Sequence, residues 1–243
     1  MTPSPAVAVA VARGGDAKRS YVRSMFTAIA PRYDFLNHLL SLNVDRRWRH
    51  TAVARLSWET RADGLYLDLC AGTLDLAAAL ARAPGFRGTV VGADFVVPML
   101  VRGRGKAAAT RAVAADALTL PFAAAQFDGA MVAFGVRNLA DLDAGLEEAA
   151  RVLKPGARFV VLEFATPRRR LLRALYLFYF RRLLPAIGRA VSKHRDAYTY
   201  LPASVLEFPE PDALARRLET AGFRDVAFEL LSGGICAVHH GAR

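Results

Sequence analysis

The chain has 243 residues, 53% of them hydrophobic, so it can bury one large core and is not disordered over its whole length. No apolar run reaches the ~20 residues that a membrane-spanning helix needs. The net charge of +11 indicates an anionic partner, either nucleic acid or an acidic membrane surface, or else a solvated basic face. The two cysteines, Cys70 and Cys236, lie far apart in apolar segments, which favours reduced thiols in a cytoplasmic protein over a disulfide framework.

The N-terminal region divides into a tail and a helical segment. Residues 1–17 are expected to form a disordered tail, because their Ala-Val repeat has no positively charged start and does not resemble a signal peptide. Apolar positions then recur at helical spacing over 21–29 and stop at Pro31. Helices ahead of a first strand often cover the mouth of an α/β site, so residues 18–60 are expected to form a helical lid. The alternative is that their aromatic residues only pack on the sheet.

Residues 65–75 predict a buried strand that runs directly into a helix. A bend of small residues at the carboxyl end of a first strand gathers backbone N–H groups and a helix N-terminus, where α/β sheets hold ligands. The dinucleotide pattern Gly-x-Gly-x-x-Gly is absent. An acid just before the bend, Asp68, resembles instead motif I of the S-adenosylmethionine (SAM) methyltransferases, with Gly72 in the bend. Leu74 stands where those enzymes usually carry a second glycine.

A second predicted strand, 89–94, places another acid at the same rim. Asp94 follows Gly72 by 22 positions, close to the spacing at which an acid reaches a ribose in these folds. A carboxylate at a strand end can accept hydrogen bonds from both ribose hydroxyls. The following residues, 95–100, offer apolar groups to cover an adenine face.

Two further strands are predicted to end at polar residues. The segment 112–115 ends at Asp116, which is expected to accept a proton of the adenine amino group. The strand 129–134 leads into Gly-Val-Arg-Asn, which places the polar pair Arg137 and Asn138 at the same rim.

The remaining pattern completes an α/β fold. A helix over 141–153 and a strand over 158–164 make the fifth alternation of strand and helix, which favours a parallel, doubly wound sheet. A helix over 211–221 is followed by two segments, 223–231 and 235–238, that are expected to close the sheet as an antiparallel pair. His239 and His240 are interpreted as a surface tail, and no metal site is expected.

An insertion over 167–200 breaks this rhythm. Between residues 167 and 195 there are nine Arg or Lys residues and no acid before Arg195, interleaved with leucine, tyrosine and phenylalanine. This composition is typical of an element at an anionic membrane surface. It is also compatible with a helical cap over the pocket, and nucleic acid is a third alternative, although dense aromatic residues beside leucine suit acyl chains better.

Two long signatures resemble the ubiquinone/menaquinone biosynthesis C-methyltransferases, over residues 20–241. The first is Tyr-Asp-Phe-Leu-Asn-His-Leu-Leu-Ser at 33–41 with a later Trp48, and the second is Arg-Val-Leu-Lys-Pro-Gly-Ala-Arg-Phe-Val-Val-Leu-Glu-Phe-Ala at 151–165. The chain departs from that family by Leu36 in place of Met and by Asp45 where many members have His.

The resemblance implies a class I SAM-dependent methyltransferase fold over 61–243 and assigns site residues. The expected cofactor-binding residues are Asp68, Gly72, Thr73, Asp94, Asp116 and Ala117, and Ala133 stands where the family often has Ser. The expected catalytic residues are Arg137, which would hold a developing phenolate oxygen or polarise a bound water, Asn138, which would position either, and Tyr33, which would hydrogen-bond the substrate. The proton acceptor is left open between Asp34, which could instead cap a helix, and His194.

The expected function is therefore SAM-dependent methylation of a ring carbon in a prenylated quinol, demethylmenaquinol first and a ubiquinol precursor second. The substrate is nearly insoluble, so the protein is expected in the cytoplasm, bound peripherally to anionic lipid at the inner face of the membrane. No nucleic-acid partner is expected, and the chain could form a homodimer. An RNA or small-aromatic methyltransferase and a non-catalytic SAM-binding scaffold of a quinone-synthesis complex are the alternatives.

Overall fold

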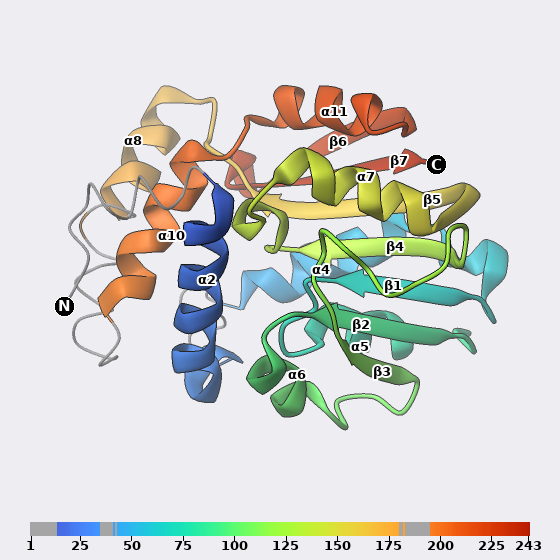
Figure 1. The fold of residues 1–243 in the computed structure, drawn as a ribbon. Helices are drawn as coiled ribbons and strands as arrows, with labels where there is room; N and C mark the ends of the chain where they lie inside the picture. Colours follow the sequence, from blue (N-terminus) through green and yellow to red (C-terminus); the bar gives the residue numbers. More distant parts are fainter. Residues whose placement is uncertain (1–13, 35–40, 42, 180–181, 183–194) are drawn as a thin grey trace.

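A mixed sheet of seven strands runs through the part of the chain that the computed structural model describes, residues 14–34, 41, 43–179, 182 and 195–243 (Figure 1). The spatial order is β3-β2-β1-β4-β5-β7-β6. The strands are β1 (Leu65–Leu69), β2 (Thr89–Asp94), β3 (Thr110–Ala114), β4 (Phe127–Ala133), β5 (Leu153–Phe164), β6 (Arg224–Leu231) and β7 (Cys236–Ala242).

Helices and 3₁₀ turns connect these strands. They are α2 (Gly15–Ile29), η1 (Ala30–Arg32), α4 (Val44–Arg55), η2 (Trp58–Arg61), α5 (Asp75–Ala81), α6 (Val97–Gly103), η3 (Val136–Asn138), α7 (Leu142–Val152), α8 (Arg170–Phe178), α10 (Arg195–Glu207), α11 (Pro211–Thr220) and η5 (Ser232–Gly234). Several stretches lie outside the described residues: 1–13 of the predicted 1–17 tail, 35–40 of the first signature, residue 42, and 180–181 and 183–194 of the insertion, His194 included.

The sheet has the predicted doubly wound topology. Strands β1 to β5 pair in parallel, whereas β7 runs antiparallel to β5 and β6 runs antiparallel to β7. Parallel strands buried on both faces are nearly continuous in apolar residues, as β1 and β4 are. The carboxyl ends of five strands therefore meet at one edge, where the sequence places its polar residues.

Two apolar layers cover the sheet, and side chains alternate between them. One layer contains Leu67 of β1 with residues of α7 and α11, such as Leu146 and Leu214. The other contains Tyr66 of β1 with residues of α4 and α5, such as Trp48. Asp68 follows this alternation onto the second face, so its carboxylate points toward the helix α5 that follows the turn.

The N-terminal helix α2 stands across the carboxyl edge of the sheet. It packs on η1, η3, α6 and α10, and Figure 1 shows α10 beside it on the side away from the strands. The helix begins at Gly15, before the expected boundary at residue 18, and ends one residue before the 3₁₀ turn that holds Pro31. An N-terminal helix over the strand ends agrees with the sequence pattern; its opening and closing as a lid stays a prediction.

The expectation of a surface tail at His239 is wrong. β7 lies between β5 and β6, so His239 is buried inside the sheet, where its ring stacks on Phe228 and its Nε2 lies 2.9 Å from the carbonyl oxygen of Pro211. Burial lowers the pKa of His239 to about 4, which leaves the ring neutral at pH 7. The strand continues through His240 to Ala242, because the pairing with β5 and β6 extends that far.

Leu74 occupies a left-handed backbone conformation that glycine would adopt more easily. Its φ is +63° and it directly precedes α5, yet its side chain is fully buried. A Cβ on Gly92 would lie 2.1 Å from Leu74 Cδ2, and a Cβ on Gly103 would lie 2.8 Å from Leu74 Cγ. The two glycines thus leave room for the leucine in the core between β2 and α6, so the side chain lies beneath the turn.

This packing predicts strong coupling between Gly92 and Leu74. Gly92→Ala overpacks the core and should lower the free energy of unfolding by about 1–3 kcal/mol, and Leu74→Ala should lower it by about 2–5 kcal/mol. In the double variant the new methyl group occupies space that the leucine vacates, so the loss should be smaller than the sum of the two. Urea unfolding followed by circular dichroism measures all three; strictly additive losses would contradict this packing.

Candidate active site

A hollow opens at the carboxyl edge of the sheet, beneath α2. The cavity has a volume of about 60 Å³ and opens to solvent at its mouth. Each of the first four strands contributes a wall residue at or just after its end, and α2 contributes Arg19, Val22 and Phe26. The predicted residues that line it are Gly72, Asp94, Asp116, Ala117, Asn138 and Tyr33.

The carboxylate of Asp94 is held in a fixed orientation at the end of β2. Its Oδ2 accepts the backbone N–H of Gly72 at 2.8 Å, and its Oδ1 accepts that of Val96 at 2.8 Å. Burial raises the pKa of Asp94, and the backbone N–H groups oppose that shift. Each carboxylate oxygen has a second lone pair for a ligand, so the geometry suits a diol such as the hydroxyls of a ribose.

Asp68 and Thr73 lie behind the wall of the hollow. Asp68 is 1% exposed, and its Oδ2 accepts the backbone N–H of Ala77 at 2.8 Å, which ties the first turn of α5 to β1. Thr73 Oγ1 donates to Asp34 Oδ1 at 2.5 Å. Neither side chain lines the hollow, so in this structure both hold the turn from beneath.

Asp116 joins the end of β3 to α2. Its Oδ1 accepts the N–H of Leu118 at 3.0 Å, and its Oδ2 forms an ion pair with Arg19 of α2. The ion pair spans the mouth of the hollow, since both residues line it. Arg19 was not singled out from the sequence; it is one of many arginines on exposed helix positions.

An ionic network ties the residues after η1 to the turn between β1 and α5. Lys106 Nζ lies 2.8 Å from Asp34 Oδ2 and 2.5 Å from Asp75 Oδ1. Arg49 of α4 lies 3.8 Å from the same Asp75. Asp34 therefore contacts Lys106 and Thr73 on the outer side of the turn and is not among the residues that line the hollow.

Arg137 is buried and paired with an acid that the sequence pattern did not single out. Its Nη1 donates to Glu163 Oε1 at 2.7 Å and to the carbonyl of Phe134 at 2.6 Å, and its guanidinium lies over the ring of Phe164. Burial raises the pKa of Glu163, against the effect of Arg137. The sequence signal that could have identified Glu163 is its position inside the apolar strand β5, because a buried acid is rarely left without a partner.

Asn138 offers an unsatisfied acceptor to the hollow. Its Nδ2 donates to Phe134 O at 3.2 Å, whereas its Oδ1 is buried and has no hydrogen-bond partner in the described structure. Buried polar atoms are normally satisfied, so this oxygen points to a ligand that donates a hydrogen bond. Tyr33 lines the same hollow and packs edge-on against Phe26 at 5.8 Å between ring centroids.

The residues present fit SAM. The carboxylate of Asp94 suits the ribose, Val96 and Met99 supply apolar cover for an adenine ring, and Asn138, whose buried Oδ1 has no hydrogen-bond partner in the described structure, lines the same space. A doubly wound sheet with an acid at the second strand end and an antiparallel closing pair is the fold of the class I SAM-dependent methyltransferases. Solved structures agree on the fold: a SAM-dependent methyltransferase of Thermotoga maritima superposes with a TM-score of 0.60 at 17% identity, covering 90% of this chain and 98% of the other.

The chain belongs to the ubiE/COQ5 methyltransferase family, because the sequence model of that family matches residues 15–243. It is 50% identical over 224 residues to a protein of Thermus thermophilus named demethylmenaquinone methyltransferase, covering 90% of this chain and 100% of that protein. It is 44% identical over 232 residues to a protein of Geobacter sulfurreducens named ubiquinone/menaquinone biosynthesis C-methyltransferase UbiE, covering 93% and 90%. The resemblance seen in the two signatures is thereby confirmed.

The burial of Asp68 predicts a pH-dependent stability. Burial raises its pKa from 3.8 to about 7, so the folded state binds the proton more tightly than the unfolded state does. The stability that Asp68 contributes is therefore present at pH 4 and is lost as the pH rises toward 7. Asp68→Asn keeps an acceptor for Ala77 and should remove this part of the pH dependence, measured by urea unfolding from pH 4 to 8.

The exposed Asp63, substituted as Asp63→Asn, provides the control, because its pH profile should match that of the wild type. A profile for Asp68→Asn that keeps the wild-type slope between pH 4 and 7 would contradict the assignment.

Proposed function

We propose that the protein transfers a methyl group from SAM to a ring carbon of a prenylated quinol, with demethylmenaquinol as the first substrate and a ubiquinol precursor as the second. The hollow carries this proposal: it lies in a chain of the ubiE/COQ5 family, and it is lined by Asp94 and by Asn138, whose buried Oδ1 has no hydrogen-bond partner in the described structure. The relatives named for menaquinone and ubiquinone biosynthesis support the quinol.

The chemistry of the residues on the cofactor side of the hollow suggests a role for each of them. Asp94 would accept the ribose hydroxyls, the backbone at Gly72 and the buried Asp68 would shape the turn near the amino-acid end, and Thr73 would fix that turn through Asp34. Asp116 and Ala117 stand where the adenine edge would lie. When bound, SAM supplies an electrophilic methyl group activated by its sulfonium charge.

The substrate side must generate electron density on the ring. Loss of the proton from a quinol hydroxyl does this, and Asn138 Oδ1 can accept a hydrogen bond from that hydroxyl and so fix its position. Arg137 stays protonated and is fixed by Glu163, so its positive field favours a developing phenolate oxygen. Tyr33 lines the roof, where it can hydrogen-bond the same ring.

Turnover on short-chain quinols tests the proposed function. Incubation with SAM and a demethylated naphthoquinol, kept reduced, should give a product heavier by one methyl group in mass spectrometry, and less product with a benzoquinol precursor. SAM binding by calorimetry without any methylated quinol would favour a non-catalytic scaffold, and methylation of RNA instead would favour the other alternative.

The role of Asp94 predicts a selective loss of cofactor affinity. Asp94→Asn should weaken SAM binding about 10- to 100-fold, because a hydrogen bond to a charged group contributes about 1.5–3 kcal/mol. Isothermal titration calorimetry gives the Kd, and Asp143→Asn on the exposed end of α7 is the control. An unchanged Kd in Asp94→Asn would remove the ribose assignment.

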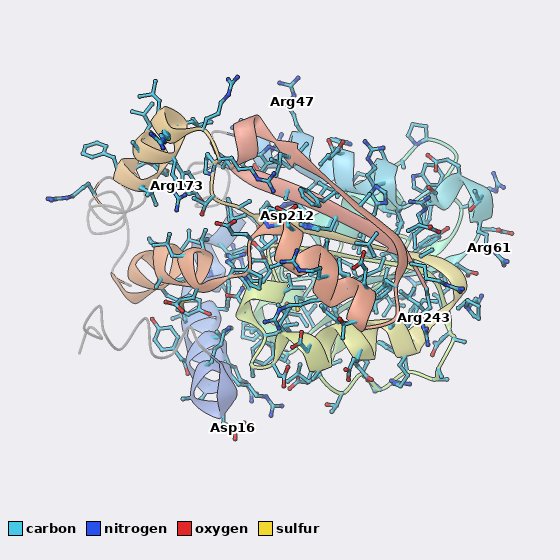
Figure 2. All side chains as sticks on the ribbon, turned by 90° about the horizontal axis from the view of Figure 1, so that it is seen from above. Asp16, Arg47, Arg61, Arg173, Asp212 and Arg243 are labelled. Atoms are coloured by element: carbon cyan, nitrogen blue, oxygen red, sulfur yellow. The ribbon has the colours of Figure 1, made fainter. Side chains whose placement is uncertain are left out.

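We further propose that α8 binds the inner face of an anionic membrane peripherally. Among the described residues, no helix has the length and apolar character needed to traverse a bilayer. α8 exposes Leu171, Leu175 and Phe178 at 77%, 59% and 57%, at positions i, i+4 and i+7 of one face. Exposed arginines flank this stripe, and Figure 2 shows Arg173 at the end of the molecule opposite Arg61. Apolar side chains and bases on one helix suit acyl chains and anionic headgroups.

Charge and apolar changes on α8 should lower membrane binding separately. Replacement of Arg169, Arg170 and Arg173 by Gln should weaken binding to phosphatidylglycerol vesicles about 100-fold or more, at about 1 kcal/mol for each base. Replacement of Leu171, Leu175 and Phe178 by Ser should weaken it at high salt as well. Vesicle sedimentation measures both effects.

The matched control replaces Arg61, Arg87 and Arg216, which are exposed outside α8, by Gln. All variants should bind SAM as the wild type does. Equal sedimentation of the α8 variants, the control and the wild type would reject α8 as the membrane contact.

A further inference from the structure

Lys18 of α2 is a buried cation without an acidic partner. It is 6% exposed, and among the described residues no ion pair or hydrogen bond involves its ammonium group. The other two lysines of the described chain, Lys106 and Lys154, both pair with acids. The sequence contains 29 arginines and only four lysines. A buried lysine can lose its proton, whereas an arginine stays charged.

Lys18 lies on the helix that packs on the residues proposed to hold the quinol oxygen. The first turn of α2 presses on the chain just after η3, because Gly15 N–H donates to the carbonyl of Ala140 at 3.0 Å. α2 packs on η3, which carries Arg137 and Asn138, and the positive charge of Arg137 acts on Lys18. Val22, one turn along α2, lines the hollow; Lys18 is buried on the same helix face but is not itself among the lining residues.

The surroundings of Lys18 favour its neutral form. On η3, the cation Arg137 acts on Lys18. On α10, Tyr200 packs on Val22, and its buried hydroxyl has no hydrogen-bond partner in the described structure. On α6, the charged side chain is the exposed Arg102. Among the described residues, no acid forms an ion pair with Lys18. Burial, with Arg137 as the second cause, lowers the pKa of Lys18 from 10.5 to about 8.

The carboxylates around the hollow are all engaged. Asp94 accepts two backbone N–H groups, Asp116 pairs with Arg19, and Glu163 pairs with Arg137. Asp34, expected from the sequence as one proton acceptor, contacts Lys106 and Thr73 on the outer side of the turn. A neutral amine at Lys18 is the base in this region whose lone pair has no fixed donor among the described residues.

We propose that Lys18, in its neutral form, accepts the hydroxyl proton of the quinol. This inference rests on the proposed function. The O–H bond breaks and an N–H bond forms on Lys18, while the oxygen keeps the electron pair as a phenolate beside Asn138 and the field of Arg137. The ring carbon then forms a bond to the methyl carbon as the methyl–sulfur bond breaks, and that electron pair stays on sulfur.

The remaining steps restore the base. The methylated ring carbon loses its hydrogen to water as a proton, and the electron pair of that C–H bond restores the aromatic ring and the negative oxygen. The ammonium of Lys18 returns its proton to that oxygen. One proton reaches the solvent in each turnover, and no oxidant or reductant is needed.

The first measurement does not depend on turnover. Protein labelled with ¹³C at the lysine Cε should give four signals, one of which titrates near pH 8 and is absent in Lys18→Met. Four signals that all titrate above pH 10 would overturn the inference even if the variant did not fold.

The second measurement separates a base from a fixed charge. Single-turnover rates of the wild type should rise about tenfold per pH unit up to about pH 8 and then level off. Lys18→Met and Lys18→Arg should both lose about 10²–10⁴-fold in rate while keeping the wild-type Kd for SAM, because arginine keeps the charge but cannot give up its proton. Lys154→Arg is the matched control.

Two outcomes overturn the inference in distinguishable ways. A wild type that methylates the quinol, together with an equally active Lys18→Arg, overturns the role of Lys18 alone. A wild type that binds SAM but methylates no quinol overturns the proposed function and this inference with it.

Discussion

One hydrogen bond, from the N–H of Gly72 to the carboxylate of Asp94, fixes the ends of two neighbouring strands relative to each other. It closes the turn after β1 against the end of β2, and the second oxygen of the same carboxylate fixes the start of α6 through Val96. The turn can take this position because Leu74 places its side chain in the core, over Gly92 and Gly103. The geometry of the hollow therefore depends on an acid above the turn and on two glycines below it.

Two buried arginines near the hollow are compensated by acids and rings, and one of those rings, Phe134, lines the hollow. Arg49 lies over the ring of Phe134 and Arg137 lies over the ring of Phe164, and these two rings contact each other with centroids 4.7 Å apart. Each guanidinium thus has an aromatic face on one side and acidic partners on another, Asp75 and Glu163 respectively. Because a buried charge is costly without such partners, this arrangement holds both cations in place beneath the substrate region.

Local patterns predicted the strands and the rim of the site, whereas contacts between distant segments decided the rest. The residues of β1 and β2 were predicted from their apolar runs, and Asp94 and Asn138 do line the hollow. Asp68 belongs to the same motif but faces α5, which follows from strand alternation once the second face is known to be covered. The burial of His239 depends on the position of β7 between two strands, which no local pattern contains.

The residues that the sequence did not reveal share one physical property: their roles arise from an imbalance of charge in a buried place. Glu163 is an acid in an apolar strand that finds Arg137, and together they are neutral. Lys18 becomes a second cation beside that pair once it takes the quinol proton, and among the described residues no acid forms an ion pair with it. The phenolate formed in the same step balances that new charge, and the field of Arg137 favours the phenolate over the neutral quinol. In this way, the charges at the contact between α2 and η3 both recognise the substrate and activate it.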